Sequence, residues 1–284
     1  MDKFTQLTQI GQSLWYDNIQ RRLLQNGELA AMIARGEIRG VTSNPSIFNN
    51  AIAKSNDYDA ALKPMAWGGW NPEQIFFQLA VEDIRAATDL FRDLYDESQA
   101  GDGYVSLEVS PRLAHNAAKT LEQAKALWQR VNRPNLMIKI PATRACLKAI
   151  RSTIAAGVNV NVTLIFSLER YAEVIEAYLS GLEDRVARGE AINRIASVAS
   201  FFVSRVDSKV DALLQAIIAK GGPDAEKARS LQGKAANANA RLAYHLHEET
   251  MASERWQRLL SKGARAQRPL WASTSTKNPA YPDL

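Results

Sequence analysis

Short apolar segments alternate along this chain with longer segments in which apolar residues recur every three or four positions. The short segments predict strands, at 13–17, 40–44, 104–110, 135–141, 158–166, 195–203 and 268–274. The longer segments predict helices, at about 20–35, 76–94, 113–131, 143–156, 168–188 and 206–220, with an alanine-rich helical region at 224–260. Strands that alternate with helices in this way predict an α/β fold built on a parallel sheet.

Several of the predicted strands have one polar face. In the strand at 158–166, valines alternate with Asn159, Asn161 and Thr163. Helices cover both faces of a parallel sheet, so a polar face must fill a barrel interior or line a ligand site. In a (β/α)8 TIM barrel, catalytic groups lie at the carboxyl ends of strands. Near such ends stand Asp17, Asn44, Glu108, Lys139, Thr163 and Ser200. We therefore predict a TIM barrel.

The length and composition of the chain suit one large domain. It has 284 residues, of which 46% are hydrophobic, and we expect a single domain over 1–284. Only seven of the eight strands of a TIM barrel are visible, and the chain stops at 280–284, where another helix and strand are expected. We therefore expect the C-terminal β/α unit to be missing. Its loss would leave unpaired edges on the first and seventh strands, which lowers stability and solubility.

Lys139 interrupts the apolar run at 135–141. Taking an ammonium group out of water penalises its charged form, which favours the neutral nucleophile that a Schiff-base lysine needs. The alternative is a lysine whose stem packs while its head group reaches solvent, and for an isolated lysine this is the commoner case. The polar residues at the ends of the neighbouring strands favour the first interpretation.

The charge pattern bears on the partners of the chain. A net charge of +5 would suit an anionic partner. Because Lys and Arg are interleaved with Asp and Glu along the helical segments, the pattern favours phosphorylated small molecules over nucleic acid. No stretch approaches the roughly 18–20 apolar residues of a membrane span, so we expect no membrane partner. The sequence leaves open whether the chain forms a homo-oligomer.

The cysteine and histidine content bears on compartment and metals. The single Cys146 excludes an intrachain disulfide and fits a reducing cytoplasm, where we expect the chain to be located. We interpret it as a packing residue. The three histidines, His115, His245 and His247, lie in predicted helical stretches away from the strand ends. We therefore predict no metal site.

Four segments, each on its own predicted strand, resemble the transaldolases. They are Val41-Thr-Ser-Asn-Pro-Ser46, Leu107-Glu-Val-Ser-Pro-Arg112, Leu136-Met-Ile-Lys-Ile-Pro141 and Asn159-Val-Asn-Val-Thr-Leu-Ile-Phe-Ser167. A fifth, Trp271-Ala-Ser-Thr-Ser-Thr-Lys-Asn-Pro279, resembles the longer branch of that family found in bacteria. Each motif is short enough to arise by accident, but their order along the chain makes the resemblance specific.

The resemblance implies a class I aldol transfer without a cofactor. A transaldolase moves a dihydroxyacetone unit from sedoheptulose 7-phosphate to glyceraldehyde 3-phosphate, giving erythrose 4-phosphate and fructose 6-phosphate, in the pentose phosphate pathway. Lys139 would form a Schiff base with the ketose, and the protonated imine would accept the electrons of the broken carbon-carbon bond. The expected partners are therefore sugar phosphates.

The resemblance also assigns the proton transfers. Asp17 falls at the position of the general base that takes a proton from the substrate hydroxyl. The alternative is an aspartate that caps a helix starting at Asn18. Glu108 and Thr163 match the pair that holds a water during imine formation. Their alternative is a buried carboxylate satisfied by a hydroxyl group.

Further residues match positions that contact the ketose. Asn44 and Asn161 correspond to residues that bind the dihydroxyacetone hydroxyls, although Asn44 before Pro45 could instead form a turn. Ser200 and Phe202 match residues that line the site beside the imine. A phenylalanine in such a strand is more often part of the core.

The phosphate would be bound mainly by Arg205, whose planar guanidinium group suits a phosphate dianion. The alternative for an isolated arginine is a surface salt bridge. Ser273 matches a second phosphate contact. Ser275, however, stands where many transaldolases have another arginine, and this departure leaves the phosphate affinity in doubt. Lys277 is our candidate for supplying the missing charge.

Two other functions stay open at this point. A fructose 6-phosphate aldolase would use the same lysine but release free dihydroxyacetone, although those aldolases are shorter chains. A non-catalytic, truncated remnant would lack a working site, and the missing final strand is the only support for that reading.

Overall fold

The computed structural model describes residues 2–279 and 281. The chain divides into two compact units, Met1–Lys139 and Ile140–Leu284, called unit 1 and unit 2 below. Each consists of parallel strands and the helices that connect them. The single domain expected over 1–284 stays a prediction.

Unit 1 contains the first three strands and most of the fourth. They are β1 (Trp15–Tyr16), β2 (Gly40–Val41), β3 (Tyr104–Glu108) and β4 (Leu136–Pro141), whose last two residues belong to unit 2. Consecutive strands pair in parallel, and Glu108 stands opposite Lys139. Gly40 of β2 stands opposite Trp15 of β1. A glycine is required there, because a Cβ atom would approach the Trp15 ring to 2.6 Å.

The helices of unit 1 precede β1 or follow β1, β2 and β3 along the chain. They are α1 (Lys3–Gln9), α2 (Arg21–Gln25), α3 (Glu28–Ala34), α4 (Pro45–Ala53), α5 (Asp59–Trp67), α6 (Pro72–Leu90), α7 (Arg92–Glu97), the 3-10 helix η1 (Pro111–Leu113) and α8 (Ala117–Val131). The longest, α6, buries Leu79, Ala80 and Ile84 and packs against β3 and α8. This packing holds α6 against β3, the strand that carries Glu108.

Two helical predictions in unit 1 need correction. The single helix expected at 20–35 is two helices, because Gly27 adopts a left-handed φ of 81° and separates α2 from α3. The helices α1, α4 and α5 were not predicted. The prolines between 45 and 72 disfavour helix in the sequence pattern. Pro45 and Pro72, however, stand in the first turns of α4 and α6, where a missing N–H group costs nothing.

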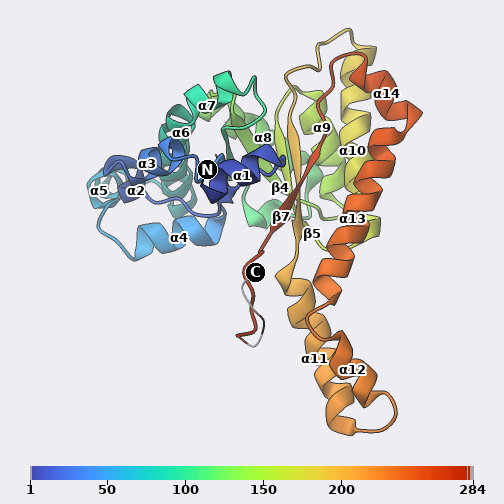
Figure 1. The fold of residues 1–284 in the computed structure, drawn as a ribbon. Helices are drawn as coiled ribbons and strands as arrows, with labels where there is room; N and C mark the ends of the chain where they lie inside the picture. Colours follow the sequence, from blue (N-terminus) through green and yellow to red (C-terminus); the bar gives the residue numbers. More distant parts are fainter. Residues whose placement is uncertain (1, 280, 282–284) are drawn as a thin grey trace. The chain divides into compact units, whose positions relative to one another are not determined.

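Unit 2 contains the remaining strands, β5 (Val160–Ile165), β6 (Ser197–Phe202) and β7 (Arg268–Ala272), paired in parallel. Its helices are α9 (Cys146–Ala155), α10 (Leu168–Ala187), α11 (Ser204–Lys220), α12 (Ala225–Leu231), α13 (Ala235–Ala252) and α14 (Glu254–Leu260). Figure 1 shows α10 beside α13, and α11 and α12 as a hairpin. The alanine-rich region at 224–260, predicted to be helical, contains the three helices α12, α13 and α14.

One irregularity interrupts β5. The register with β6 shifts between Val162 and Ile165, and Leu164 has a left-handed φ of 61°. A shift of this kind is a bulge, which turns a side chain out of the strand's regular alternation. As a result, Leu164 is 41% exposed while Thr163 before it is 1% exposed. The predicted alternation therefore holds only as far as Thr163.

The observed order of elements confirms the predicted fold class. All seven predicted strands are present, each shorter than expected, and β1 to β6 are each followed by helix in the β/α order of a TIM barrel. The segment 280–284, on which the expectation of a missing final unit rested, lies outside the described residues except for Tyr281. Within the described part of the chain, none of the helices is long and apolar enough to cross a membrane.

An arginine joins two helices of unit 2. Arg255 in α14 donates to Glu176 at 2.5 Å and to Glu183 at 2.7 Å, both in α10. The hydrogen bonds from Arg255 and then from Ser180 lower the pKa of Glu176 to about 2. Because the folded pKa lies below the ordinary value, the stabilisation is complete above about pH 4.5 and is lost as pH falls toward 2.

We predict that Glu176→Gln lowers the free energy of unfolding by about 1 kcal/mol at pH 7, the upper end for exposed ion pairs. The difference from the parent should shrink as pH falls from 5 toward 3 in urea titrations. Glu254→Gln is the matched control, because Glu254 is 97% exposed and 3.8 Å from Arg258, and it should change little at either pH. An equal loss for Glu176→Gln at every pH would contradict the assignment.

Candidate active site

Lys139 is buried in the middle of β4. The residue is 6% exposed and its neighbours Ile138 and Ile140 are fully buried. Its Nζ lies 3.5 Å from Glu108 Oε2 and donates to the Ser43 carbonyl oxygen at 3.1 Å. The head group therefore does not reach solvent, and the alternative interpretation of this lysine is wrong.

Glu108 faces Lys139 because the two residues are in register on adjacent parallel strands. Its side chain is 12% exposed. Burial raises the pKa of the Glu108 carboxyl above its ordinary value, Lys139 opposes this shift, and the charge of Asp17 adds to it. A carboxyl group with a raised pKa beside a buried amine is suited to accepting and returning a proton.

Asp17 follows β1 and is exposed. The hydroxyl group of Thr42, just after β2, donates to Asp17 Oδ1 at 2.6 Å. The alternative for Asp17 as a helix cap is wrong, because α2 begins at Arg21 and its N-cap residue is Gln20. The side chain therefore has free acceptor capacity at the carboxyl end of β1.

A buried network anchors the chain just after Asp17. Arg21 pairs with Asp83 of α6 at 2.8 Å, and its backbone N–H donates to the Tyr58 hydroxyl at 3.0 Å. Tyr58 in turn donates to Asp83 Oδ2 at 2.8 Å. The Arg21 guanidinium also lies 4.7 Å from the centre of the Tyr58 ring. The segment that carries Asp17 is thus fixed at both ends, by β1 and by this network.

Asn44 stands at the carboxyl end of the β2 segment and begins α4. Its side-chain oxygen accepts from the Ile47 N–H at 3.0 Å, so it caps the helix that Pro45 starts. The alternative of a turn at Asn44 is therefore replaced by a helix cap. The Asn44 amide Nδ2 has no partner among the described residues and is available to a ligand.

In unit 2, polar groups lie buried on neighbouring strands. Ser200 of β6 donates to Asn161 Oδ1 of β5 at 2.7 Å, and both residues are almost fully buried. Thr163, on the same face of β5 as Asn161, is also buried. The predicted polar face of this strand is therefore internal, as expected for a helix-covered sheet.

A second group of predicted residues gathers at the start of α11. The Arg205 guanidinium lies 5.2 Å from the centre of the Phe202 ring. Ser204 donates from its N–H and its hydroxyl to the Ser273 carbonyl at 3.0 and 2.6 Å, and the two hydroxyl groups are 3.1 Å apart. Arg205 has no carboxylate partner within 4 Å in the described part of the chain. The described residues therefore give no support to its alternative as a surface salt bridge.

The comparisons with known proteins agree with these sites. The family model described as transaldolase/fructose-6-phosphate aldolase matches residues 14–284. The chain is 50% identical to the transaldolase of Frankia alni over 279 residues, 98% of this chain and 74% of that relative. It is 50% identical to transaldolase 1 of Streptomyces avermitilis over 283 residues, 100% and 73% of the two chains. The transaldolase of Trichodesmium erythraeum is 45% identical over 281 residues, 98% and 74% of the two chains. This chain belongs to the transaldolase/fructose-6-phosphate aldolase family.

Membership in this family confirms the resemblance read from the five motifs. It also makes the chain an enzyme, a transferase with transaldolase function, because relatives that are 45–50% identical over nearly its whole length are transaldolases.

Some predicted residues are not engaged with the rest of the site. Lys277 is exposed and donates to its neighbour Ser275 at 2.6 Å. His115 lies in the turn between η1 and α8, not in a helix as predicted, while His245 and His247 are in α13. Within the described residues no group of three or more His, Cys, Asp or Glu side chains is placed to hold a metal ion.

Sequence reasoning missed several residues that build the site. Thr42 contacts Asp17, and Ser43 contacts Lys139. Both lie inside the motif at 41–46, next to the predicted Asn44. Ser204 was missed because its contact with Ser273 joins segments 69 positions apart. Asp83 gave a usable signal, since it is a charged residue on the apolar stripe of α6.

We predict that Glu108→Gln lowers kcat at least about 100-fold, the usual contribution of a positioned acid or base. In the parent, activity should fall on the acid side at a pH above the ordinary glutamate range, because the carboxyl pKa is raised and only the carboxylate accepts a proton. That acid limb should be missing from the pH profile of the variant. Glu37→Gln, at an exposed pair with Arg35, is the control and should leave the profile unchanged. A variant that keeps the parental acid limb would remove Glu108 from this role.

Proposed function

We propose that this enzyme transfers a dihydroxyacetone unit from sedoheptulose 7-phosphate to glyceraldehyde 3-phosphate, giving erythrose 4-phosphate and fructose 6-phosphate in the pentose phosphate pathway. The observation that carries the proposal is the buried amine of Lys139 between Glu108 and the Ser43 carbonyl. A buried amine with an adjacent proton acceptor is what covalent catalysis through an imine requires.

Imine formation begins with the proton of Lys139. Its two contacts stabilise the ammonium form, so the nucleophile is made when the amine passes a proton to Glu108, 3.5 Å away. The neutral amine then attacks the C2 ketone of the sugar. Loss of water gives the protonated imine, and the carbinolamine oxygen takes its proton from the same acid. The family resemblance gives Thr163 a part in these water-dependent steps.

Carbon-carbon cleavage needs a base at the substrate C4 hydroxyl. In the proposal Asp17 takes that proton, the C3–C4 bond breaks, the aldose leaves and its bonding electrons pass into the imine to form an enamine. The hydrogen bond from Thr42 orients one carboxylate oxygen of Asp17 and leaves the other available. Addition to the acceptor aldehyde reverses these steps, and Asp17 returns the proton to the new alkoxide.

Substrate binding is assigned from the resemblance, with support from local contacts. Asn44 offers its free amide group, and Asn161 is held by Ser200 in a buried position suited to a sugar hydroxyl. The Arg205 guanidinium lies over the Phe202 ring, which supports its position. Arg205 and Ser273 would bind the phosphate, because a helix N-terminus and an unpaired arginine both favour an anion. Lys277 would add a weaker, more distant charge.

The alternatives are less well supported. A fructose 6-phosphate aldolase belongs to the same family, but the relatives that match 98–100% of this chain are transaldolases. A non-catalytic remnant does not account for a buried lysine held in register with a carboxylate. We also propose a cytoplasmic location, which the single Cys146 supports, and sugar phosphates rather than nucleic acid or membranes as partners; a homo-oligomer stays a prediction.

We predict that fructose 6-phosphate with borohydride leaves a reduced three-carbon adduct on Lys139, located by peptide mass spectrometry. Lys139→Ala should form no adduct and should transfer three-carbon units at least about 1,000-fold more slowly, because the covalent route is lost. Lys148→Ala, at an exposed lysine of the following helix, should behave as the parent. Transfer by Lys139→Ala at the parental rate would contradict the proposal.

The same assay separates the transferase from the aldolase. Without an acceptor, a transaldolase retains the unit as its imine, whereas an aldolase releases free dihydroxyacetone continuously. For the parent and for Lys148→Ala, we expect less than one equivalent of free dihydroxyacetone per chain in the early phase. The amount should not rise further in either protein. Steady release at the rate of the transfer reaction would assign the aldolase function instead.

We predict that Arg205→Gln raises KM for fructose 6-phosphate about tenfold or more, the usual effect of losing a charge-assisted hydrogen bond. Lys277→Ala should raise it less, because that amine already donates to Ser275. Free fructose, which has no phosphate group, is the control substrate, and neither variant should change its slow turnover. An unchanged KM in Lys277→Ala would remove Lys277 from the site.

A further inference from the structure

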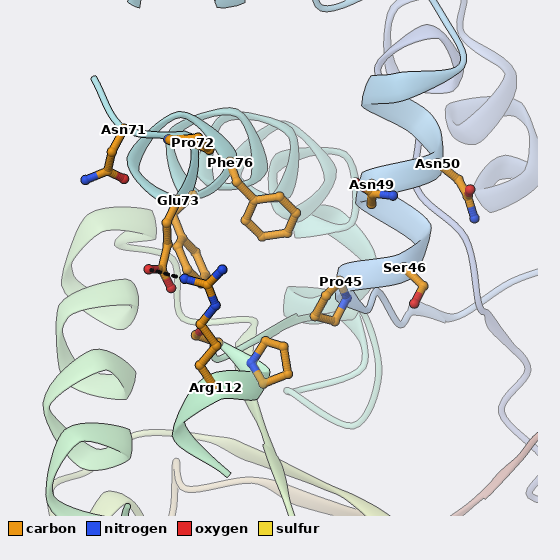
Figure 2. Close-up of a pocket in the computed structure, with 12 residues that line it drawn as sticks. Pro45, Ser46, Asn49, Asn50, Asn71, Pro72, Glu73, Phe76 and Arg112 are labelled. Atoms are coloured by element: carbon orange, nitrogen blue, oxygen red, sulfur yellow. Dashed lines mark ion pairs between the residues drawn. The ribbon is translucent and has the colours of Figure 1, made fainter. Parts of the chain in front are cut away.

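A groove of about 880 Å³ lies in unit 1 between α4 and α6. Figure 2 shows α4 on one side, α6 on the other, and Arg112 of η1 reaching up between them. The groove begins just beyond the carboxyl ends of β2 and β3, because Pro45 follows Asn44 and Ser110 follows the end of β3. None of Lys139, Glu108 and Asp17 lines it. The residues that line the groove are therefore different from those to which the proposed chemistry is assigned.

The charge in the groove is weakly engaged. Arg112 is 82% exposed, and Glu73 at 4.0 Å is its carboxylate partner, itself 46% exposed. An exposed pair at this distance adds almost nothing to stability. Glu73 is also in the first turn of α6, where the helix dipole stabilises its charge without Arg112. Arg112 can thus leave Glu73 for an anionic ligand at little cost, and its guanidinium fork suits a phosphate group.

An aromatic ring is held on the α6 side of the groove. Phe76 is in edge contact with Phe48 at 5.9 Å and with Phe77 at 5.2 Å between ring centres. These contacts fix the ring, and Figure 2 shows it pointing into the space between α6 and α4. A fixed, partly exposed ring of this kind packs well against the apolar C–H face of a sugar.

Hydrogen-bonding groups line the other surfaces. Asn71 uses its oxygen to cap α6, which leaves its Nδ2 as a donor. Ser46 and Asn49 on α4 have no side-chain hydrogen bond within the described part of the chain. The side chains of Asn71, Ser46 and Asn49 can each donate to sugar hydroxyls. Those of Ser46 and Asn49 can also accept from them. A cation, a fixed ring and several free polar groups are therefore present in a cavity of ligand size.

We propose that this groove is a second binding site for a phosphorylated sugar or sugar alcohol, with the phosphate on Arg112, the hydroxyl groups on Ser46, Asn49 and Asn71, and the carbon chain against Phe76. The site needs no carbonyl group, so its ligand is recognised without imine chemistry. A sugar phosphate bound there would occupy the enzyme without entering the reaction.

The test is calorimetric titration with glucitol 6-phosphate, a hexitol phosphate that has no carbonyl group and cannot react with Lys139. It is carried out in an Arg205→Gln background, which weakens the proposed catalytic phosphate site. We expect one saturable site per chain. Adding Arg112→Gln should weaken binding at least tenfold, and adding Phe76→Leu several-fold. Adding Arg92→Gln, at an exposed pair with Asp96, should change nothing. Melting curves of all variants check that they fold.

Three outcomes would overturn the inference. They are the absence of saturable binding in the Arg205→Gln chain, equal binding after Arg112→Gln, and equal affinity for inorganic phosphate, which would show a simple anion site. Failure of the proposed transaldolase chemistry is distinguishable, because borohydride trapping on Lys139 is measured separately. An enzyme that traps the adduct but does not bind glucitol 6-phosphate through Arg112 would refute only the second site.

Discussion

The charge on Lys139 is the constraint on which the site of unit 1 depends. A buried ammonium without a partner would destabilise the fold by about 3–5 kcal/mol, so the surrounding elements have to provide compensation. Glu108 supplies the opposite charge and Ser43 supplies a carbonyl oxygen. These partners come from the ends of β3 and the β2 segment, so the same contacts set the strand register and the position of the Lys139 amine. Ser43 is fixed in turn by donating its hydroxyl to the Ser106 carbonyl.

Compensation of this charge also explains how the amine can become reactive. Burial alone would favour a neutral lysine, but a permanent salt bridge would keep it protonated. Here burial raises the pKa of the Glu108 carboxyl. Glu108 therefore accepts a proton more readily than an exposed glutamate would. The raised pKa of Glu108 therefore favours its role as the proposed proton acceptor beside Lys139. In the proposed reaction the protonated imine keeps a positive charge beside Glu108, so the carboxylate can stabilise it as it stabilises the ammonium group.

The sequence predicts those features that depend on local periodicity, and it misses those that depend on distant contacts. All seven strands were found because a buried parallel strand is a short apolar run, and the position of Lys139 in such a run marked it at once. The break at Gly27 was missed because helical periodicity continues through it. The network of Arg21, Tyr58 and Asp83 was missed because it joins segments that are 37 and 62 positions apart. No pattern within one element can reveal such a contact.

Arginines show most clearly what only the structure can decide. In the sequence, Arg21, Arg112, Arg205 and Arg255 are equivalent charged residues on helices or at their ends. In the structure, Arg21 and Arg255 are committed to two carboxylates each, and their removal would leave those acids unpaired. Arg112 has one distant partner, and for Arg205 none is found among the described residues. A cation that the fold does not need for its own charge balance is the one that is free to bind a ligand. For this reason we place the two proposed anion sites on Arg205, at the start of α11 in unit 2, and on Arg112, in the groove beside α6 in unit 1.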